Sequence, residues 1–455
     1  MKFKSFALTF LSLCVATVAS GMEGAKAASL SVVADGLDNP RNLDWDKDGN
    51  AYVTLSGRGG DGNGGVNCIP SPSAQYIPLC SGNTGSVVKI APDGTKTNFI
   101  DNLTSIALVP SGEQAAGPAD FKFDSQGNAY LLTGVAGDPT SRDTVLQAPD
   151  LGKLYRVDLG TGALTTLADF AEYEAKNNVD GSDLISNPYA FTIKGNTAYV
   201  VDGGANVIYS VGLDGSGIKN AAALPQQLIP TNQLEFPTLP EGVVDPTGGA
   251  APPPGFAIAD NGLPVSQQSI PTAITVAPDG SLTLAEYTYF PYPENKARIY
   301  SVNPDSLEAT VIDTGFTQLT GATYDSEGNL YVLQHINQSE WKGIQQGGII
   351  TGDISGSIIK IGKDGSRETI LSGDGLEAAS GLFFGPDGDL YTSNRARLAA
   401  GEQGGQLVKI ALKSGGAAKV PEPGSVIALL ATAALGAKAM KRKRQQQLLD
   451  KVETI

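Results

Sequence analysis

Histidine is the scarcest of the residues on which catalysis and metal binding depend: the 455-residue chain has one, His335. A single histidine excludes a multi-histidine metal centre and leaves a Ser-His-Asp triad with one candidate base. No G-x-S-x-G segment accompanies it, so nothing marks a serine nucleophile. His335 follows an expected strand at the mouth of a long connection, where a loop-packing or surface role is preferred over a catalytic one.

Charged residues are also few, at 17% of the chain, while 41% of residues are hydrophobic. This balance is typical of a folded protein rather than a disordered one. Lys and Arg total 32 against 47 Asp and Glu, a formal net charge of −15. Residues 28–412 contain no Lys/Arg cluster, which excludes a nucleic-acid partner because phosphate binding needs clustered positive charge.

The N-terminal segment has the three-part pattern of a secretory signal peptide. Lys2 and Lys4 precede a short apolar run, and an A-x-A cleavage site ends at Ala27. We therefore expect export and removal of residues 1–27, with a retained membrane anchor as the alternative. Export predicts residence in the periplasm, at the cell surface or in the extracellular matrix.

Cysteine is nearly absent, with three in the chain, and Cys14 would leave with the signal peptide. Cys68 and Cys80 remain, twelve positions apart in a Gly/Pro-rich segment. In an oxidising compartment this pair predicts one disulfide, and two unpaired thiols are the alternative.

The C-terminal region has no apolar run long enough for a lasting anchor. Residues 426–437 are about half of the roughly 20 that span a bilayer, which favours a transient membrane contact. Pro421-Glu422-Pro423 precedes this run and a Lys/Arg cluster follows it. This order resembles the PEP-CTERM sorting signal of bacterial envelope proteins, and the resemblance implies removal of the tail by an exosortase-type sorting enzyme. An amphipathic terminal helix is the alternative.

A strand–turn–strand unit recurs six times in the body of the chain. Each copy has an apolar strand, a tight turn with Gly and a second strand, which is a β-hairpin pattern. A third strand follows every copy and a fourth follows most. The copies begin near residues 40, 118, 188, 271, 320 and 380. Six such units predict an all-β fold, a six-bladed β-propeller.

The sixth unit lacks a fourth strand of its own. Leu30–Leu37 resembles the fourth-strand segment Thr369–Leu376, and both lead directly into a first strand. We therefore expect an N-terminal strand to complete the last blade and close the ring. The predicted organisation is a signal peptide (1–27), a propeller (28–412), a linker (413–420), a sorting tail with a short transmembrane-like helix (421–444) and a polar extension (445–455).

The connections after second strands are mostly long, and in a propeller they lie on one face. Functional residues are often carried on such loops above a rigid scaffold. A further excursion, residues 214–269, is rich in Pro and Gly and is predicted either to wrap over the surface or to stay mobile. Strand ends on this face supply eleven candidates: Asn39, Arg41, Asp120, Asn187, Asp202, Thr272, Glu286, Tyr287, His335, Asn394 and Arg395.

Four of these candidates have the ligand chemistry that Ca²⁺ prefers, carboxylate and amide oxygens. They are Asp120, Asn187, Asp202 and Glu286. The alternative is that Arg41 and Arg395 neutralise the carboxylates. The remaining seven candidates are predicted to contact a ligand.

Residues 44–50 read D-x-D-x-D-G-N, like the start of an EF-hand loop. Leu55 stands where the bidentate Glu of such a loop is needed. Related turns recur at 124–128 and 325–329, so tight-turn chemistry is the preferred interpretation.

The body also resembles a known family, ScyD/ScyE, most clearly in residues 36–43 and in the Gly/Cys-rich loop 57–80. Its members are exported NHL-like propellers named from the cyanobacterial scytonemin pigment cluster. The resemblance implies an envelope role around pigment maturation and supplies no defined catalytic residues.

Two functions follow as hypotheses. The first is a non-enzymatic envelope protein that binds a partner protein, a glycan or a small molecule such as a pigment precursor. The alternative is a calcium-dependent hydrolase or lactonase, and a quinone-dependent dehydrogenase is a more distant third. Fold alone decides none of them.

Overall fold

The computed structural model describes residues 28–72, 77–235, 263–345, 349–397 and 404–412. The predicted signal peptide (1–27) and everything after residue 412, including the sorting signal Pro421–Pro423, lie outside the described residues. Among the described residues, none of the helices has the length and apolar character that a membrane crossing requires.

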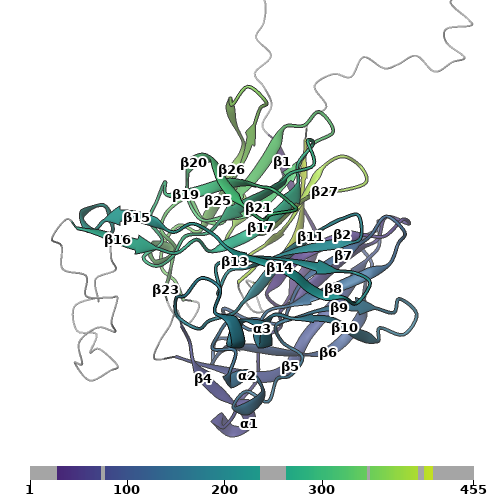
Figure 1. Cartoon of the computed structure of the whole chain (residues 1–455). Helices are drawn as coiled ribbons and strands as arrows, with labels where there is room; N and C mark the ends of the chain where they lie inside the picture. The colour runs from purple at the N-terminus through teal and green to yellow at the C-terminus, as the bar shows by residue number, and fades with distance from the viewer. Residues whose placement is uncertain (1–27, 73–76, 236–262, 346–348, 398–403, 413–455) are drawn as a thin grey trace, which may run out of the picture. The chain divides into compact units, whose positions relative to one another are not determined.

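Six antiparallel sheets form the body of the chain (Figure 1). Blade one contains β2 (Pro40–Trp45), β3 (Ala51–Leu55), β5 (Pro78–Ile90) and β6 (Lys96–Leu108). Blade two contains β7 (Pro118–Phe123), β8 (Ala129–Thr133), β9 (Lys153–Val157) and β10 (Leu164–Asp169). Blade three contains β11 (Pro188–Lys194), β12 (Thr197–Asp202), β13 (Val207–Gly212) and β14 (Gly217–Ala223).

The second half of the ring repeats this plan. Blade four contains β17 (Pro271–Val276), β18 (Leu282–Glu286), β19 (Ala297–Val302) and β20 (Ala309–Phe316). Blade five contains β21 (Leu319–Tyr324), β22 (Leu330–Gln334), β25 (Ser355–Ile361) and β26 (Arg367–Glu377). Blade six contains β27 (Ser380–Phe384), β28 (Leu390–Asn394), β29 (Gly405–Ala411) and β1 (Ser29–Leu37).

The first strands of the blades form a closed ring. They contact one another in the order β2, β7, β11, β17, β21, β27 and back to β2. Second strands such as β3 and β8 are buried along their whole length, whereas the outer strand β20 is largely exposed. Burial therefore falls from the axis outward, because neighbouring blades cover each other's faces near the centre. The six-bladed propeller prediction is confirmed.

The N-terminal strand completes the last blade, as expected. β1 pairs antiparallel with β29 from Ser29 opposite Ala411 to Leu37 opposite Gly405. Leu37 is fully buried. The first and last described strands thus share one sheet, with the purple β1 beside the yellow strands of blade six in Figure 1.

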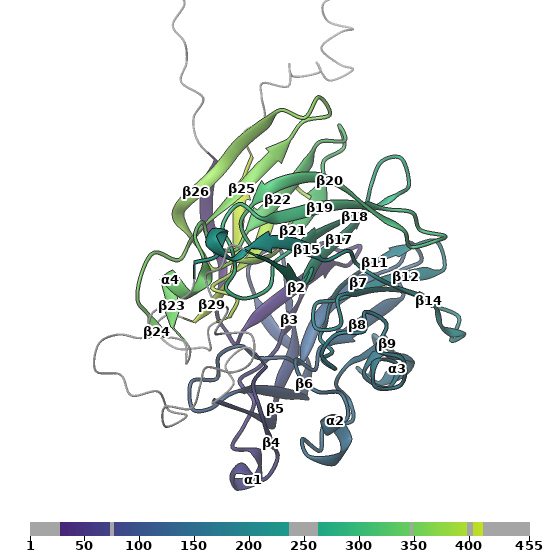
Figure 2. The same ribbon diagram turned by 60° about the vertical axis from the view of Figure 1, so that its left-hand side comes forward.

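The connections carry the remaining elements, including α4 and the β23–β24 hairpin, which lie next to each other in Figure 2. These elements are α1 (Gly62–Gly65), β4 (Cys68–Pro70), α2 (Ser141–Thr144), α3 (Phe170–Asn177), β15 (Gln227–Pro230), η1 (Thr231–Gln233), β16 (Pro264–Gln267), α4 (Glu340–Gly343), β23 (Ile344–Gln345) and β24 (Ile349–Ile350). The excursion 214–269 is thus partly regular: it contributes β14 to blade three and forms the β15–β16 hairpin. Residues 236–262 lie outside the described part of the chain.

The disulfide between Cys68 and Cys80 is confirmed. The segment around it is more regular than expected, because β4 pairs with an extended β5 and places the two cysteines opposite each other. The bond therefore staples a short hairpin of blade one.

The EF-hand-like segment is a tight turn, as preferred. One carboxylate oxygen of Asp46 accepts hydrogen bonds from the backbone N–H groups of Asp48 and Asn50, both at 2.9 Å. Gly49 has a φ of 81°, which glycine adopts without strain. Asp124 and Asp325 make the same bonds in blades two and five. The aspartates thus stabilise hairpin turns.

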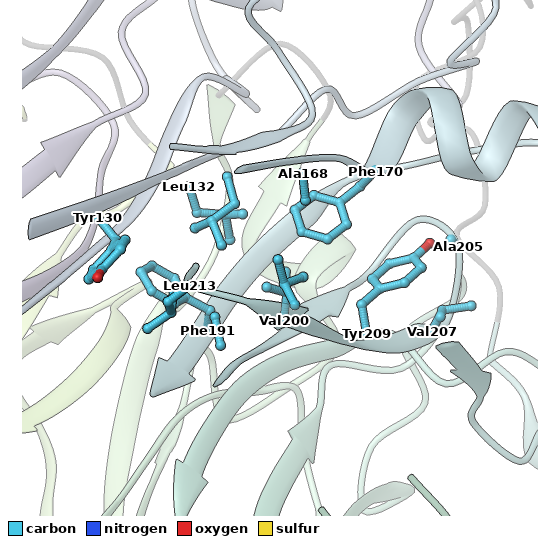
Figure 3. Close-up of a cluster of buried hydrophobic side chains, with 13 residues drawn as sticks. Tyr130, Leu132, Ala168, Phe170, Phe191, Val200, Ala205, Val207, Tyr209 and Leu213 are labelled. Atoms are coloured by element: carbon cyan, nitrogen blue, oxygen red, sulfur yellow. The ribbon is translucent and has the colours of Figure 1, made fainter. Parts of the chain in front are cut away.

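Hydrophobic clusters fill the space between neighbouring blades. Figure 3 shows one of them, where Leu132 of blade two meets Phe191 and Val200 of blade three. Helix α3 joins this cluster through Phe170, whose ring lies 5.0 Å from that of Tyr209 between centroids. This contact packs the helix against β13 of blade three.

Candidate ligand site at the propeller axis

Each blade supplies one residue, at or near the start of its first strand, to the wall of a cavity on the axis. The cavity has a volume of about 260 Å³. The six residues are Arg41, Ala119, Tyr189, Thr272, Thr320 and Ser380. In every blade except the sixth, the residue falls within a β-bulge, where the register between first and second strands shifts. Because a bulge re-aims side chains, the same irregularity in successive blades builds the cavity wall.

The long connections complete the wall with small and apolar side chains. Those lining the cavity include Leu79, Ala115, Ala116, Ala136, Ile185 and Ile270. A mostly apolar wall with a few placed polar groups is the usual composition of a small-molecule site.

A hydrogen bond across the axis closes one side of the cavity. Tyr189 comes from blade three and Ser380 from blade six, which face each other in a ring of six. Their hydroxyl oxygens lie 2.7 Å apart. The axial channel is therefore bridged by side chains at this level.

Two further wall hydroxyls join neighbouring blades. Thr272 donates to the carbonyl of Leu319 at 2.6 Å, and Thr320 donates to the carbonyl of Ala379 at 2.8 Å. These bonds connect blade four to blade five and blade five to blade six. The two hydroxyls are thus part of the scaffold, although both residues line the cavity.

Arg41 is the cation of the wall, and its side chain is buried. The guanidinium donates to the carbonyl of Ala115 at 2.8 Å and to the carbonyl of Ala396. Burial lowers the pKa of Arg41, and the positive charge of Arg397 lowers it further. In the described part of the chain, Arg41 forms no ion pair with a carboxylate.

His335 lines the same cavity with a neutral ring. Its Nδ1 lies 2.8 Å from the carbonyl oxygen of Ala379, and since a carbonyl oxygen can only accept, Nδ1 carries the proton. Burial lowers the pKa of His335 to about 3, and the charges of Arg397 and Arg41 also lower it. At pH 7 the other ring nitrogen, Nε2, therefore keeps a lone pair that can accept a hydrogen bond.

A buried ionic network reaches the wall of the cavity through Tyr287, Glu340 and Arg397. Arg397 bridges the carboxylates of Glu113 and Glu340, and the hydroxyl of Tyr287 also donates to Glu340. The four residues come from four different connections. Burial raises the pKa of Tyr287 well above its usual value, so the phenol stays protonated and remains a donor. The network ties the long loops together around the cavity.

The structure brings together five of the eleven predicted site residues. Those lining the cavity are Arg41, Asn187, Thr272, Tyr287 and His335. Asn39, Asn394 and Arg395 lie elsewhere and serve the backbone or a local pair. Asn39 donates to the carbonyls of Gly57 and Gly112, and Asn394 donates to that of Gly375.

Arg395 pairs with Glu377 at 2.7 Å rather than with a predicted calcium ligand. This contact joins the end of β26 to the connection after β28. The alternative to a calcium site was that Arg41 and Arg395 neutralise the carboxylates of Asp120, Asp202 and Glu286. In the described residues, neither arginine forms an ion pair with any of these carboxylates.

The four predicted calcium ligands are not gathered in one place. Asp120 binds Lys122 at 2.8 Å and accepts from the backbone N–H of Phe191 at 2.9 Å, which joins blades two and three. Burial raises the pKa of Asp120 to about 6, against the lowering effect of Lys122. In the described ranges, no group of three or more His, Cys, Asp or Glu side chains is placed to hold a metal ion.

Asp202 and Glu286 also have local partners. Asp202 accepts from the backbone N–H of Asn187 at 2.6 Å and from those of Gly204 and Ala205 at 2.9 Å. Glu286 forms a buried ion pair with Arg298, 2.7 Å from its Nε, and accepts from Tyr300 at 2.6 Å. Asp202 and Glu286 were predicted as calcium ligands because of their residue type. In the structure, each carboxylate instead binds groups of its own blade at the end of the strand that carries it.

Sequence reasoning missed Tyr189, Glu113, Glu340 and Arg397. Tyr189 could have been found, because it follows a strand-opening proline just as Arg41 and Thr272 do. The other three residues lie in irregular connections whose paths no repeat predicts.

The fold and the site together define a six-bladed β-propeller with a small, mostly apolar cavity on its axis. No family model matches the chain, and no curated protein matches it.

Solved structures of other propellers are distantly similar to the chain. Virginiamycin B lyase from Staphylococcus aureus is 13% identical over 85% of this chain and 100% of its own, with a TM-score of 0.41. A glucose dehydrogenase is 10% identical over 85% and 100%, with a TM-score of 0.43. A luciferin-regenerating enzyme is 9% identical over 85% and 96%, with a TM-score of 0.44. Likenesses this remote leave the function to be argued from the site.

Proposed function

We propose that this chain is an exported envelope propeller that binds a small organic molecule in its axial cavity. The observation that carries the proposal is the cavity itself, whose wall takes one residue from each of the six blades. A site assembled from every repeat is held rigidly, and rigid placement of a few polar groups in an apolar wall favours specific binding.

The export part of the proposal has separate support. The signal-peptide pattern of residues 1–27 and the PEP-CTERM-like order after Pro421 both favour the envelope. The disulfide between Cys68 and Cys80 is consistent with an oxidising compartment. The resemblance to ScyD/ScyE makes a pigment precursor one compound to test.

Binding is favoured over the calcium-dependent hydrolase for a geometric reason. The hydrolase requires carboxylates that converge on one ion, whereas Asp120, Asp202 and Glu286 each hold donors of their own. A calcium-dependent rise in melting temperature would reopen that alternative.

The experiment is a ligand screen by thermal unfolding of the full chain, with a cavity-filling variant as the filter. Ala119→Phe places a ring in the cavity, and Ala163→Phe is the matched control in the exposed β9–β10 turn at the opposite end of blade two. A ligand at 100 times its Kd adds about 2.7 kcal/mol of stability.

We expect the screen to find compounds that raise the melting temperatures of the wild type and of Ala163→Phe but not that of Ala119→Phe. Ala116→Leu fills the same cavity from the preceding connection and replaces Ala119→Phe if that variant fails to fold. Stabilisation that both cavity-filling variants retain would refute the proposed site.

A further inference from the structure

Arg41 contributes a positive charge to the cavity, and no carboxylate of the described residues is in ion-pair contact with it. The side chain is 7% exposed. A guanidinium has five N–H groups, and the protein occupies two of them, on the carbonyls of Ala115 and Ala396. A buried charge is normally paired, since an unpaired one costs several kcal/mol of desolvation.

The groups that act on the Arg41 charge do not neutralise it. They are Tyr189, Tyr287 and Arg397, the first two tyrosines and the third another arginine. Arg397 has its own carboxylates, Glu113 and Glu340. The two arginines of the cavity therefore differ: Arg397 is held in a protein network, and Arg41 is left with free donors.

His335 adds an acceptor beside this cation. Its Nδ1–H is used on Ala379, so Nε2 is the ring nitrogen that can accept from a ligand hydroxyl or amine. Arg41 and His335 line one cavity and are close enough for the arginine charge to lower the pKa of the imidazole. The cavity wall thus carries the positively charged guanidinium of Arg41 and the neutral acceptor Nε2 of His335.

We infer that the ligand of the axial cavity is a small organic carboxylate that also carries a hydrogen-bond donor. The carboxylate binds the free N–H groups of Arg41, and the donor binds Nε2 of His335. Arginine is suited to this role because its planar fork matches a carboxylate. This inference rests on the proposed function, since it specifies the chemistry of a ligand in the same cavity.

The test compares matched acids and methyl esters against the full-length protein. The panel is benzoate, 4-hydroxybenzoate, lactate and mandelate, each beside its methyl ester, with inorganic phosphate as a non-organic anion. Binding is measured by thermal unfolding and by isothermal titration calorimetry. We expect the hydroxylated acids to bind, their esters to bind poorly and phosphate to have no saturable effect.

Arg41→Gln is the diagnostic variant, because Gln keeps a donor for the neighbouring carbonyls but removes the charge. Losing a hydrogen-bonded charge should weaken acid binding roughly 10- to 150-fold while leaving the melting temperature without ligand unchanged or raised. Arg395→Gln is the matched control, as Arg395 pairs with Glu377 outside the cavity. Arg41→Lys keeps the charge without the fork and should give intermediate binding.

The outcomes separate the two claims. Esters that bind as well as acids, in a manner abolished by Ala119→Phe, would overturn the carboxylate inference and leave cavity binding standing. Acid binding that survives Arg41→Gln would also overturn it. If no acid or ester binds to the wild type, the carboxylate inference fails, and failure of the ligand screen as well would remove the proposed function.

Discussion

Glu174 offers the sharpest test of the electrostatics of this structure. It lies on the inner side of α3 and its side chain is 0% exposed. Burial, together with the negative charges of Asp202 and Asp180, raises its pKa from 4.5 to about 7. The phenol of Tyr209 experiences the same three carboxylates. Glu174 is therefore expected to bind a proton in the folded protein at pH values where the unfolded chain has lost it.

The sign and size of the effect follow from linkage. The folded state holds the extra proton between pH 4.5 and 7, so the contribution of Glu174 is fully present below pH 4.5 and is lost as pH rises through 7. A shift of this size corresponds to about 3 kcal/mol. The unfolding entropy of the propeller, residues 28–412, is roughly 0.8 kcal/mol per K, so the effect is about 4 °C in Tm.

The assay is thermal unfolding of the wild type, Glu174→Gln and Glu172→Gln at pH 4.5 and pH 8. Gln has the shape of protonated Glu and never ionises, so Glu174→Gln should match the wild type at pH 4.5 and exceed its Tm by about 4 °C at pH 8. Glu172 is the control, as it is exposed on the same helix and pairs only with Lys176. A Glu174→Gln protein that melts at or below the wild-type temperature at pH 8 would refute the reasoning.

Three other predictions concern the scaffold. Removing residues 28–37 leaves the outer edge of β29 unpaired and should lower Tm by roughly 5–10 °C, whereas ending the chain after residue 412 should not; equal losses would contradict ring closure by β1. Replacing Cys68 and Cys80 by Ser should cost about 3 kcal/mol, as expected for so short a loop, and an unchanged denaturation midpoint would argue against this role. Glu286→Ala leaves the buried Arg298 without its carboxylate and should lower the free energy of unfolding by about 3–5 kcal/mol. The loss should be the same in chelator and in millimolar calcium. A loss of stability seen only with calcium would show that Glu286 belongs to a metal site.

The propeller could be predicted from sequence because each blade repeats the same local chemistry. Tight turns with Gly and apolar strands recur at each unit. The propeller prediction therefore rests on six independent copies of the same pattern. Ring closure followed from the likeness between Leu30–Leu37 and Thr369–Leu376, and the structure pairs the first of these with β29.

The site was only half predictable, for reasons visible in particular residues. Arg41 and Thr272 were found because strand starts converge on the axis. Asp120 and Glu286 were assigned to calcium because of their residue type. Lys122 lies two positions after Asp120 on the same strand, so the strand period of two could have indicated this ion pair. Arg298 comes from the neighbouring strand β19, and the partner that Glu286 takes from another strand is not specified by periodicity alone.

The buried ionic network beside the cavity could not be predicted from any repeat. Glu113, Glu340 and Arg397 converge from three separate connections of different length. They come together through the three-dimensional path of irregular loops. This placement differs from the usual expectation that the polar residues of a site stand at the ends of regular strands.

The pairing of β1 with β29 has a consequence for how the protein matures. Ser29 and Ala411, which lie side by side in the sheet, are separated by almost the whole described chain. During synthesis, which starts at the N-terminus, β1 emerges first and must wait for the last strand, so the ring stays open until the chain is complete. Contacts between such distant segments form slowly. A truncated chain would never close and would keep an unpaired sheet edge exposed, a feature by which proteases can distinguish an unfinished molecule from a finished one.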